Sequence, residues 1–239
     1  MPLIDARNIT YAPDGVPVLT DVTLRSDARR IGIVGRNGSG KTSLARVLAG
    51  LIVPDSGEVR IAGAAVGTER KAALSAVGIL FQNPDHQIIF PTVEEEIAFG
   101  LGQMGLAEAE VRAGVQAVLD RFGKTHWAKA AIHRLSQGQR QLVCLMSVLA
   151  MRPQVILLDE PFAGLDIPTS MHLSRVLADV DAALIQITHD PAMVAGYDHV
   201  LWLDGGTVTA QGAPQEVLSA FEARMTELGA GDDLSDLAG

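Results

Sequence analysis

The residues Gly35, Arg36, Asn37, Gly38, Ser39, Gly40, Lys41 and Thr42 fit the phosphate-binding pattern G-x-x-x-x-G-K-[ST]. Glycines let backbone N–H groups converge on phosphate oxygens, and the helix start that follows adds partial positive charge. We expect Lys41 to reach the β- and γ-phosphates of a nucleoside triphosphate and Thr42 to offer its hydroxyl to Mg²⁺. Ser43 belongs to the same candidate set. The alternative is a glycine-rich turn without chemical consequence.

The elements around this loop have the strand–loop–helix order that phosphate binding by this pattern requires. An apolar run at 31–34 predicts a strand before it, and residues 43–51 predict a helix after it. Two further apolar runs, 155–158 and 183–188, predict buried parallel strands. Because ligands of open α/β sheets bind at the carboxyl edge of the strands, we expect the polar residues after each run to lie at the site.

Three of these strand-end residues could act on a γ-phosphate, which requires charge neutralisation and a positioned water. Asp159 could hold Mg²⁺ through its water shell, and Glu160 could polarise the attacking water. His189 could donate a hydrogen bond to the γ-phosphate. Taken singly, a strand-end carboxylate often caps a turn and a lone histidine is usually structural. Their joint occurrence after a phosphate-binding loop favours the functional interpretation.

Two more residues are candidates with open alternatives. Gln82 ends the apolar run 77–81 and could bring an amide oxygen to Mg²⁺ or to water, although a glutamine here, taken singly, is more often a plain strand terminus. Tyr11 precedes a turn at Pro13-Asp14-Gly15, and from spacing alone it could simply cap the edge of a sheet.

A second helix start has the features of an anion site. Ser136 and Gly138, within Leu135-Ser136-Gln137-Gly138-Gln139, lead into an apolar helix that extends to Met151. Taken singly, this segment would be an ordinary capped helix.

Composition excludes several classes of protein. The chain has 239 residues and a formal net charge of −9, and its Lys and Arg residues are scattered. The sequence therefore shows no basic cluster of the kind that attracts nucleic acid. That length suits one sizeable α/β core with an embedded subdomain. The single cysteine, Cys144, lies in an apolar run and is expected to be a buried, inert thiol. No signal peptide or membrane-spanning segment is expected.

The segments before and after the phosphate-binding loop complete the predicted domain organisation. Residues 3–34 suggest an antiparallel sheet before the loop strand, and 91–151 turn helical. Thr92 is expected to cap a helix whose first turn carries Glu94-Glu95-Glu96, interpreted as a solvated helix start rather than a metal site. The predicted domain is 1–228, with a helical subdomain at about 84–152 inserted, and 229–239 is predicted to be a flexible acidic tail.

The order of these motifs resembles the nucleotide-binding subunit of the ATP-binding cassette (ABC) family over essentially the whole chain. The resemblance implies an α/β P-loop NTPase of the ABC ATPase type. Its parallel core sheet would be flanked by helices, with an antiparallel β subdomain and an inserted helical subdomain. It also implies a homodimer or heterodimer with two ATP molecules sandwiched between subunits.

The same resemblance implies a role for each candidate residue. Tyr11 would stack on adenine, and Gln82 would touch Mg²⁺ and face a membrane partner. Ser136 and Gly138, with Gln139 beside them, would contact the γ-phosphate across the dimer, and Asp166 matches the D-loop aspartate. Glu160 matches the catalytic base and His189 the switch histidine. Gln137 stands where the family most often has glycine.

Within this family, residues 81–100 are similar to the Q-loop region of the energy-coupling-factor ATPases. The resemblance implies an ATPase at the cytoplasmic face of the cell membrane that energises vitamin or transition-metal import. Its partners would be a transmembrane coupling protein and a substrate-capturing membrane protein. The compact form most resembles the biotin-transporter ATPase, with the cobalt or nickel ATPase next.

Two other functions provide alternatives. A soluble cassette ATPase could act as an assembly scaffold or in cell division. A chromosome-maintenance ATPase would need a long coiled coil or a zinc insertion, for which the sequence shows neither heptads nor sufficient cysteines.

Overall fold

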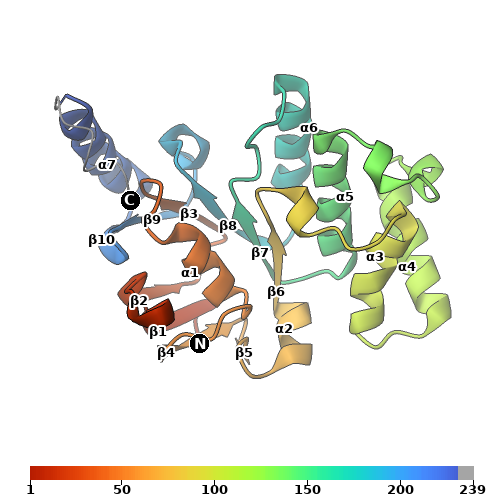
Figure 1. Cartoon of the computed structure of the whole chain (residues 1–239), viewed down its shortest axis with the longest axis horizontal. Coiled ribbons are helices and arrows are strands. Elements are labelled where there is room, and N and C mark those ends of the chain that lie inside the picture. Colours follow the sequence, from red (N-terminus) through yellow and green to blue (C-terminus); the bar gives the residue numbers. More distant parts are fainter. Residues whose placement is uncertain (231–239) are drawn as a thin grey trace. The chain divides into compact units, whose positions relative to one another are not determined.

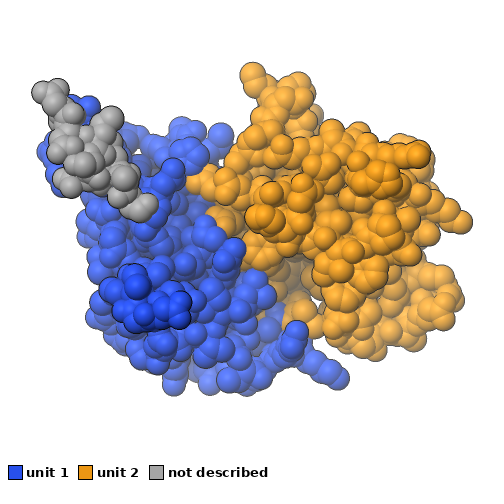
Figure 2. Space-filling model, viewed as in Figure 1, with its two compact units in different colours: residues 1–73, 183–239 blue, residues 74–182 orange. Residues whose placement is uncertain are grey.

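The computed structural model describes residues 1–230 and divides into two compact units, blue and orange in Figure 2. Unit 1 combines Met1–Ala73 with the segment that begins at Ala183, and unit 2 is Leu74–Ala182. Within the described residues, no helix is both long and apolar enough to span a bilayer. The predicted helical subdomain at about 84–152 falls inside the range of unit 2. Of the predicted tail at 229–239, residues 231–239 lie outside the described part.

Unit 1 contains the antiparallel sheet expected before the phosphate-binding loop (Figure 1). Its order is β2-β1-β4-β5. The strands are β1 (Ile4–Tyr11), β2 (Leu19–Ser26), β4 (Ser56–Ile61) and β5 (Ala64–Ala65). The register aligns Ile4 with Ser26 on one side and with Ile61 on the other. Alternate residues such as Ala6 and Leu24 are buried, as one half-covered face requires.

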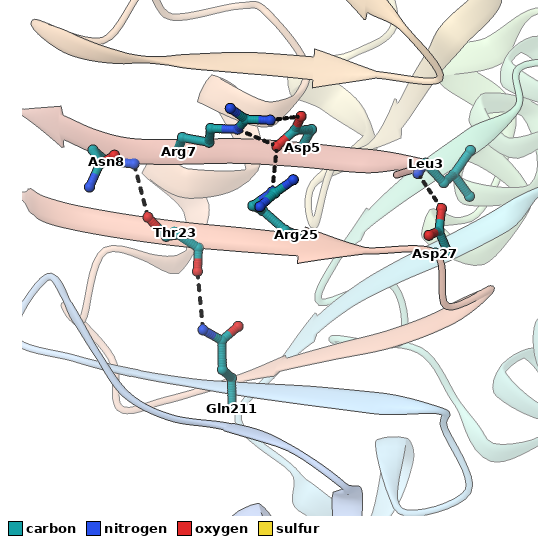
Figure 3. A network of polar contacts seen from close by, with 8 residues as sticks. All are labelled: Leu3, Asp5, Arg7, Asn8, Thr23, Arg25, Asp27 and Gln211. Carbon is teal, nitrogen blue, oxygen red and sulfur yellow. Dashed lines mark hydrogen bonds and ion pairs between the residues drawn. The ribbon is translucent and has the colours of Figure 1, made fainter. Parts of the chain in front are cut away.

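The polar face of this sheet carries the network drawn in Figure 3. Arg7 and Arg25 each form an ion pair with Asp5, at 2.7 and 3.0 Å. The Asp5 carboxyl is buried, and the hydrogen bond from Arg7, together with both guanidinium charges, lowers its pKa. Gln211 donates from its side-chain amide to the Thr23 carbonyl at 3.4 Å, which links the two sheets of unit 1.

The second group of paired strands in unit 1 includes β3, the strand that precedes the phosphate-binding loop, and is mostly buried. Its order is β10-β9-β3-β8. The strands are β3 (Arg30–Val34), β8 (Ala183–Thr188), β9 (His199–Asp204) and β10 (Thr207–Gly212). β3 runs parallel to β8 and β9, so their carboxyl ends meet at one edge, as predicted. Two helices belong to this unit, α1 (Lys41–Leu48) and α7 (Pro214–Gly229).

Unit 2 combines two parallel strands with helices. β6 (Val77–Leu80) pairs with β7 (Val155–Asp159), and Val77 aligns with Val155. The helices are α3 (Val93–Gln103), α4 (Glu108–Arg121), α5 (Gln137–Ala150) and α6 (Ile167–Ala178), while α2 (Arg70–Ala76) spans the boundary between the units. Side chains of α3, α4 and α5, among them Ile97, Leu119 and Met146, form one buried apolar cluster. Each such side chain stabilises the fold by about 1.5–3 kcal/mol through burial.

The acidic helix start at α3 differs from the prediction. Glu96 is buried, and its carboxylate accepts hydrogen bonds from the backbone N–H groups of Ile89 and Phe90, both at 2.9 Å. Thr92 occupies the N-cap position, but its hydroxyl donates to Glu95 and makes no cap bond to the backbone. The prediction of a wholly solvated first turn was therefore wrong for Glu96, because the preceding loop folds back over it.

Cys144 on α5 is fully buried, as expected. Burial raises the pKa of its thiol far above the ordinary value, so the group stays protonated and unreactive.

Candidate functional site

The phosphate-binding loop of unit 1 joins β3 to α1, as its sequence predicts. Gly38 and Gly40 adopt positive φ angles of 80° and 95°, a conformation that glycine reaches without strain. The ammonium of Lys41 donates to the carbonyls of Gly35 and Arg36, both at 2.7 Å. These bonds hold a buried cation against the loop, at the start of the helix where anions are favoured.

The loop is also tightly enclosed. A Cβ on Gly35 would lie 2.2 Å from the Leu203 carbonyl oxygen and 2.6 Å from Ser39 Oγ, so no larger residue fits. Ser39 Oγ is buried and has no hydrogen-bond partner among residues 1–230. Buried polar atoms normally have a partner, and the chemistry of this loop suits a phosphate oxygen.

His189 follows β8 and shares a pocket of ≈ 470 Å³ with the first residues of the loop, Gly35, Arg36 and Asn37. Side chains of α7, including Glu222, line another part of this pocket. The structure thus brings His189 and the loop together within unit 1. Tyr11, at the end of β1, belongs to the same unit and is partly exposed.

Asp159 and Glu160 lie at the carboxyl end of β7 in unit 2. Asp159 is buried and ends the strand. Glu160 has a φ of 47°, which is uncommon for a residue other than glycine and costs about 1–3 kcal/mol. Such strain persists where the surrounding structure fixes the backbone.

Gln82 lies two residues beyond β6 and is exposed. The backbone beside it is fixed by side chains on both sides of the loop. Gln141 of α5 donates to the Phe81 carbonyl at 3.0 Å, and Phe81 N–H donates to Gln87 at 3.2 Å. Gln141 was not predicted as a candidate, because a polar residue inside an apolar helix gives no indication of its partner.

The segment at Ser136 has the capped helix start that the sequence predicts. Ser136 is the N-cap of α5, and its Oγ accepts a hydrogen bond from Gln139 N–H at 3.3 Å. The side chain of Gln139 returns to accept from Ser136 N–H at 2.9 Å, which completes a capping box. Gly138 packs against α6 so closely that a Cβ would lie 2.5 Å from Thr169 Cγ2.

Gln137, which replaces the glycine usual in this motif, reaches a neighbouring loop. Its amide lies 3.5 Å from the Ala163 carbonyl, and a Cβ on Gly164 would lie 2.9 Å from that amide nitrogen. Asp166, two residues farther on, is the N-cap of α6 and accepts from Thr169 N–H at 2.9 Å. Hydrogen bonds from the Thr169 side chain and backbone lower the pKa of Asp166, so it stays ionised at neutral pH.

Each unit therefore gathers part of the predicted set. Unit 1 holds Tyr11, the loop residues Gly35–Ser43 and His189, and unit 2 holds Gln82, Ser136, Gly138, Gln139, Asp159, Glu160 and Asp166. Lys124 and His172 were not predicted as candidates, and they line a cavity of unit 2 together with Ser136. No sequence motif pointed to them.

Comparisons with known proteins match this chain over nearly its full length. The family model described as "ABC transporter" matches residues 20–163. The biotin transport ATP-binding protein BioM of Rhodobacter capsulatus is 50% identical over 228 residues, which cover 95% of this chain and 97% of the relative. The energy-coupling factor transporter ATP-binding protein EcfA of Methanothermobacter thermautotrophicus is 35% identical, over 92% of this chain and 74% of the relative.

A solved structure has the same fold. It is cbiO1 from Clostridium perfringens, described as part of the ABC transporter complex cbiONQ. The two chains align with a TM-score of 0.77 and 31% identity, and the alignment covers 94% of each.

Proposed function

This chain belongs to the ABC transporter family and is an ATPase subunit of the energy-coupling-factor type, and we propose that it powers the import of biotin. The observation that carries the choice of substrate is the 50% identity, over 95% of the chain, with a protein named for biotin transport. Cobalt or nickel is the next candidate, because the similar structure of cbiO1 belongs to a cbiONQ complex.

The residues of the loop fit a nucleoside triphosphate. Gly35 is enclosed, so the backbone stays accessible only because the residue has no side chain. The Ser39 hydroxyl, which has no partner among residues 1–230, can donate a hydrogen bond, and the buried Lys41 ammonium supplies a positive charge. Lys41 would exchange its carbonyl partners for β- and γ-phosphate oxygens, which are stronger acceptors because they are charged. Arg36, Asn37, Gly38, Gly40 and Ser43 would complete the phosphate cradle, and Tyr11 would stack on adenine.

The donor set also fits Mg²⁺, a hard cation that prefers oxygen ligands. Thr42, Gln82 and Asp159 offer a hydroxyl, an amide and a carboxylate oxygen. When bound, Mg²⁺ would neutralise charge that develops on the phosphates.

Hydrolysis would depend on two polar side chains at strand ends. Glu160, held by its strained backbone, would orient the attacking water and accept its proton. His189 would donate a hydrogen bond to the γ-phosphate. Neither role requires a covalent intermediate, because positioning and electrostatic stabilisation account for most of the catalysis in phosphoryl transfer.

A second ATPase subunit, identical or related, would complete each site. Its Ser136 and Gly138 would contact the γ-phosphate, while Gln139 would hold Ser136 in place through the capping box. Asp166 would lie at the dimer contact. In this scheme ATP joins the subunits and hydrolysis releases them.

We further propose that the subunit is held at the cytoplasmic face of the membrane by a transmembrane coupling protein and a substrate-capturing protein. The relatives named for transport favour this over the alternative of an assembly scaffold or a cell-division ATPase. Neither partner contact requires a membrane-spanning helix in the described part of this chain.

Co-purification and uptake test the proposal. The tagged chain, expressed with the membrane proteins encoded beside it, should be recovered in detergent as a complex, and the cells should accumulate labelled biotin. Lys41→Ala should leave the complex intact but stop uptake, whereas the matched control Lys129→Ala should leave both the complex and uptake unchanged. A chain always recovered without membrane partners would refute the importer, and uptake of cobalt or nickel instead of biotin would refute the substrate.

A further inference from the structure

A cavity of ≈ 330 Å³ in unit 2 contains Ser136 and two basic side chains without an assigned role, Lys124 and His172. The rest of its lining is apolar or uncharged, and no carboxylate contributes to it. The Lys124 ammonium therefore gives this cavity a positive charge, although the formal net charge of the chain is −9. Its charge suits a ligand that carries phosphate groups.

Lys124 is fixed at both its backbone and its ammonium. Its N–H donates to the Leu119 carbonyl at 2.8 Å, and its own carbonyl accepts from Trp127 N–H at 2.7 Å. The ammonium lies 4.8 Å from the centre of the Trp127 ring, within the range of a cation–π interaction. The side chain is therefore partly ordered before any ligand binds, which reduces the entropy cost of binding.

Neither basic side chain of this cavity is neutralised within the described part of the chain. Among residues 1–230, Lys124 forms no ion pair, and the side chain of His172 forms no hydrogen bond. The carboxylate of Asp120, four positions before Lys124, accepts instead from Thr125 Oγ1 at 2.6 Å and from Gln116 Nε2 at 2.8 Å. A fixed cation without a carboxylate partner is available to an external anion.

We propose that Lys124 is a further nucleotide-binding residue, whose ammonium contacts the triphosphate of the ATP held by the second subunit, beside Ser136. This inference rests on the proposed composite site, because Ser136 and Lys124 line the same cavity. Trp127 holds the lysine in place, and the charge attracts the phosphates. Lys124 thus makes ATP-driven dimerisation tighter without contributing to the loop of its own subunit.

The test uses full-length chain with Glu160→Gln, a change expected to permit ATP binding and dimerisation but to stop hydrolysis. Lys124→Met keeps the length of the side chain and removes its charge, Lys124→Arg keeps the charge, and Lys129→Met removes a nearby exposed charge as the control. Size-exclusion chromatography over a range of ATP concentrations gives the concentration needed for half-maximal dimer. A fluorescent ATP analogue measures binding to the monomer, and thermal unfolding reports stability.

Lys124→Met should raise the ATP concentration for half-maximal dimer about tenfold, equivalent to about 1.4 kcal/mol. Monomer affinity should not change, and Lys124→Arg and Lys129→Met should behave like the parent. A parent that dimerises while Lys124→Met responds equally well would overturn the role of Lys124 alone. An equal loss of monomer affinity, or a lowered unfolding temperature without weaker dimerisation, would also overturn it. A parent that never dimerises with ATP would overturn the composite site itself.

Discussion

Removing the carboxylate of Glu96 should release the loop that precedes α3. Both N–H groups of that loop, from Ile89 and Phe90, donate to the same oxygen of Glu96, and each bond measures 2.9 Å. The side chain is only 5% exposed, so the carboxylate is largely removed from solvent. Glu96→Ala therefore removes the group that fastens the loop to the helix.

The magnitude follows from two opposing effects. Each hydrogen bond to a charged group contributes about 1.5–3 kcal/mol, which gives an upper limit of about 3–6 kcal/mol for the pair. Removing the carboxylate also relieves the desolvation cost of a buried ion, which amounts to several kcal/mol. The loop amides are only partly buried and can regain water, so we expect a net loss of about 2–3 kcal/mol. Glu96→Gln keeps one acceptor oxygen but not the charge, so it should cost about 1 kcal/mol.

Urea denaturation measures the loss of stability, and hydrogen exchange locates it. Glu96→Ala should lower the urea midpoint and speed amide exchange at Ile89 and Phe90. Glu94→Ala is the matched control, because Glu94 lies in the same helical turn and is partly exposed. If Glu96→Ala destabilises no more than Glu94→Ala, or leaves exchange at both amides unchanged, the proposed fastening role is refuted.

Two further substitutions test the loop and the antiparallel sheet. Gly35→Ala should weaken ATP binding at least about tenfold in a nucleotide titration, because its Cβ would lie 2.2 Å from the Leu203 carbonyl oxygen. Gly102→Ala is the control and should bind ATP normally, because a Cβ there meets nothing within 4 Å. Asp5→Asn should lower the unfolding temperature at pH 7. Since ion pairing lowers the pKa of Asp5 in the folded state, its contribution exists above the unfolded pKa of about 4 and disappears as the pH falls through the folded pKa. The difference from the parent should therefore shrink below pH 4, and a difference that persists there would contradict the ionic origin.

The loop between β3 and α1 was predictable because its information is local. Strand, glycines and helix are adjacent in sequence, and the structure has them in that order. What the sequence could not reveal is the enclosure of Gly35, since Leu203 comes from a strand far along the chain. The roles assigned to the site residues remain predictions.

The helix α6 was not predicted, although its start has a recognisable signal. Asp166 at the N-cap and Pro168 in the first turn are typical of a helix N-terminus. Only Leu173 and Leu177 of this helix are buried, so its apolar periodicity is weak.

Glu96 and Lys124 show why the burial of a side chain and its contacts with other segments are hard to predict from one sequence. Local propensity places acidic residues in the first turn of a helix, but a chain reversal determines which of them is buried. Lys124 gains its fixed position from Trp127, and α5 and α6 supply the rest of the cavity lining. Both features depend on packing between segments, which no local pattern encodes.

Mixed dimers give the most direct test of the claim that ATP lies in a site shared by two subunits. Ser136→Arg and Lys41→Ala should each abolish ATP hydrolysis when present in both subunits. When the two inactive variants are mixed, every mixed dimer places both lesions in one site and leaves the other intact. We expect ATPase activity to return in the mixture, whereas a mixture as inactive as either variant alone would refute the shared site.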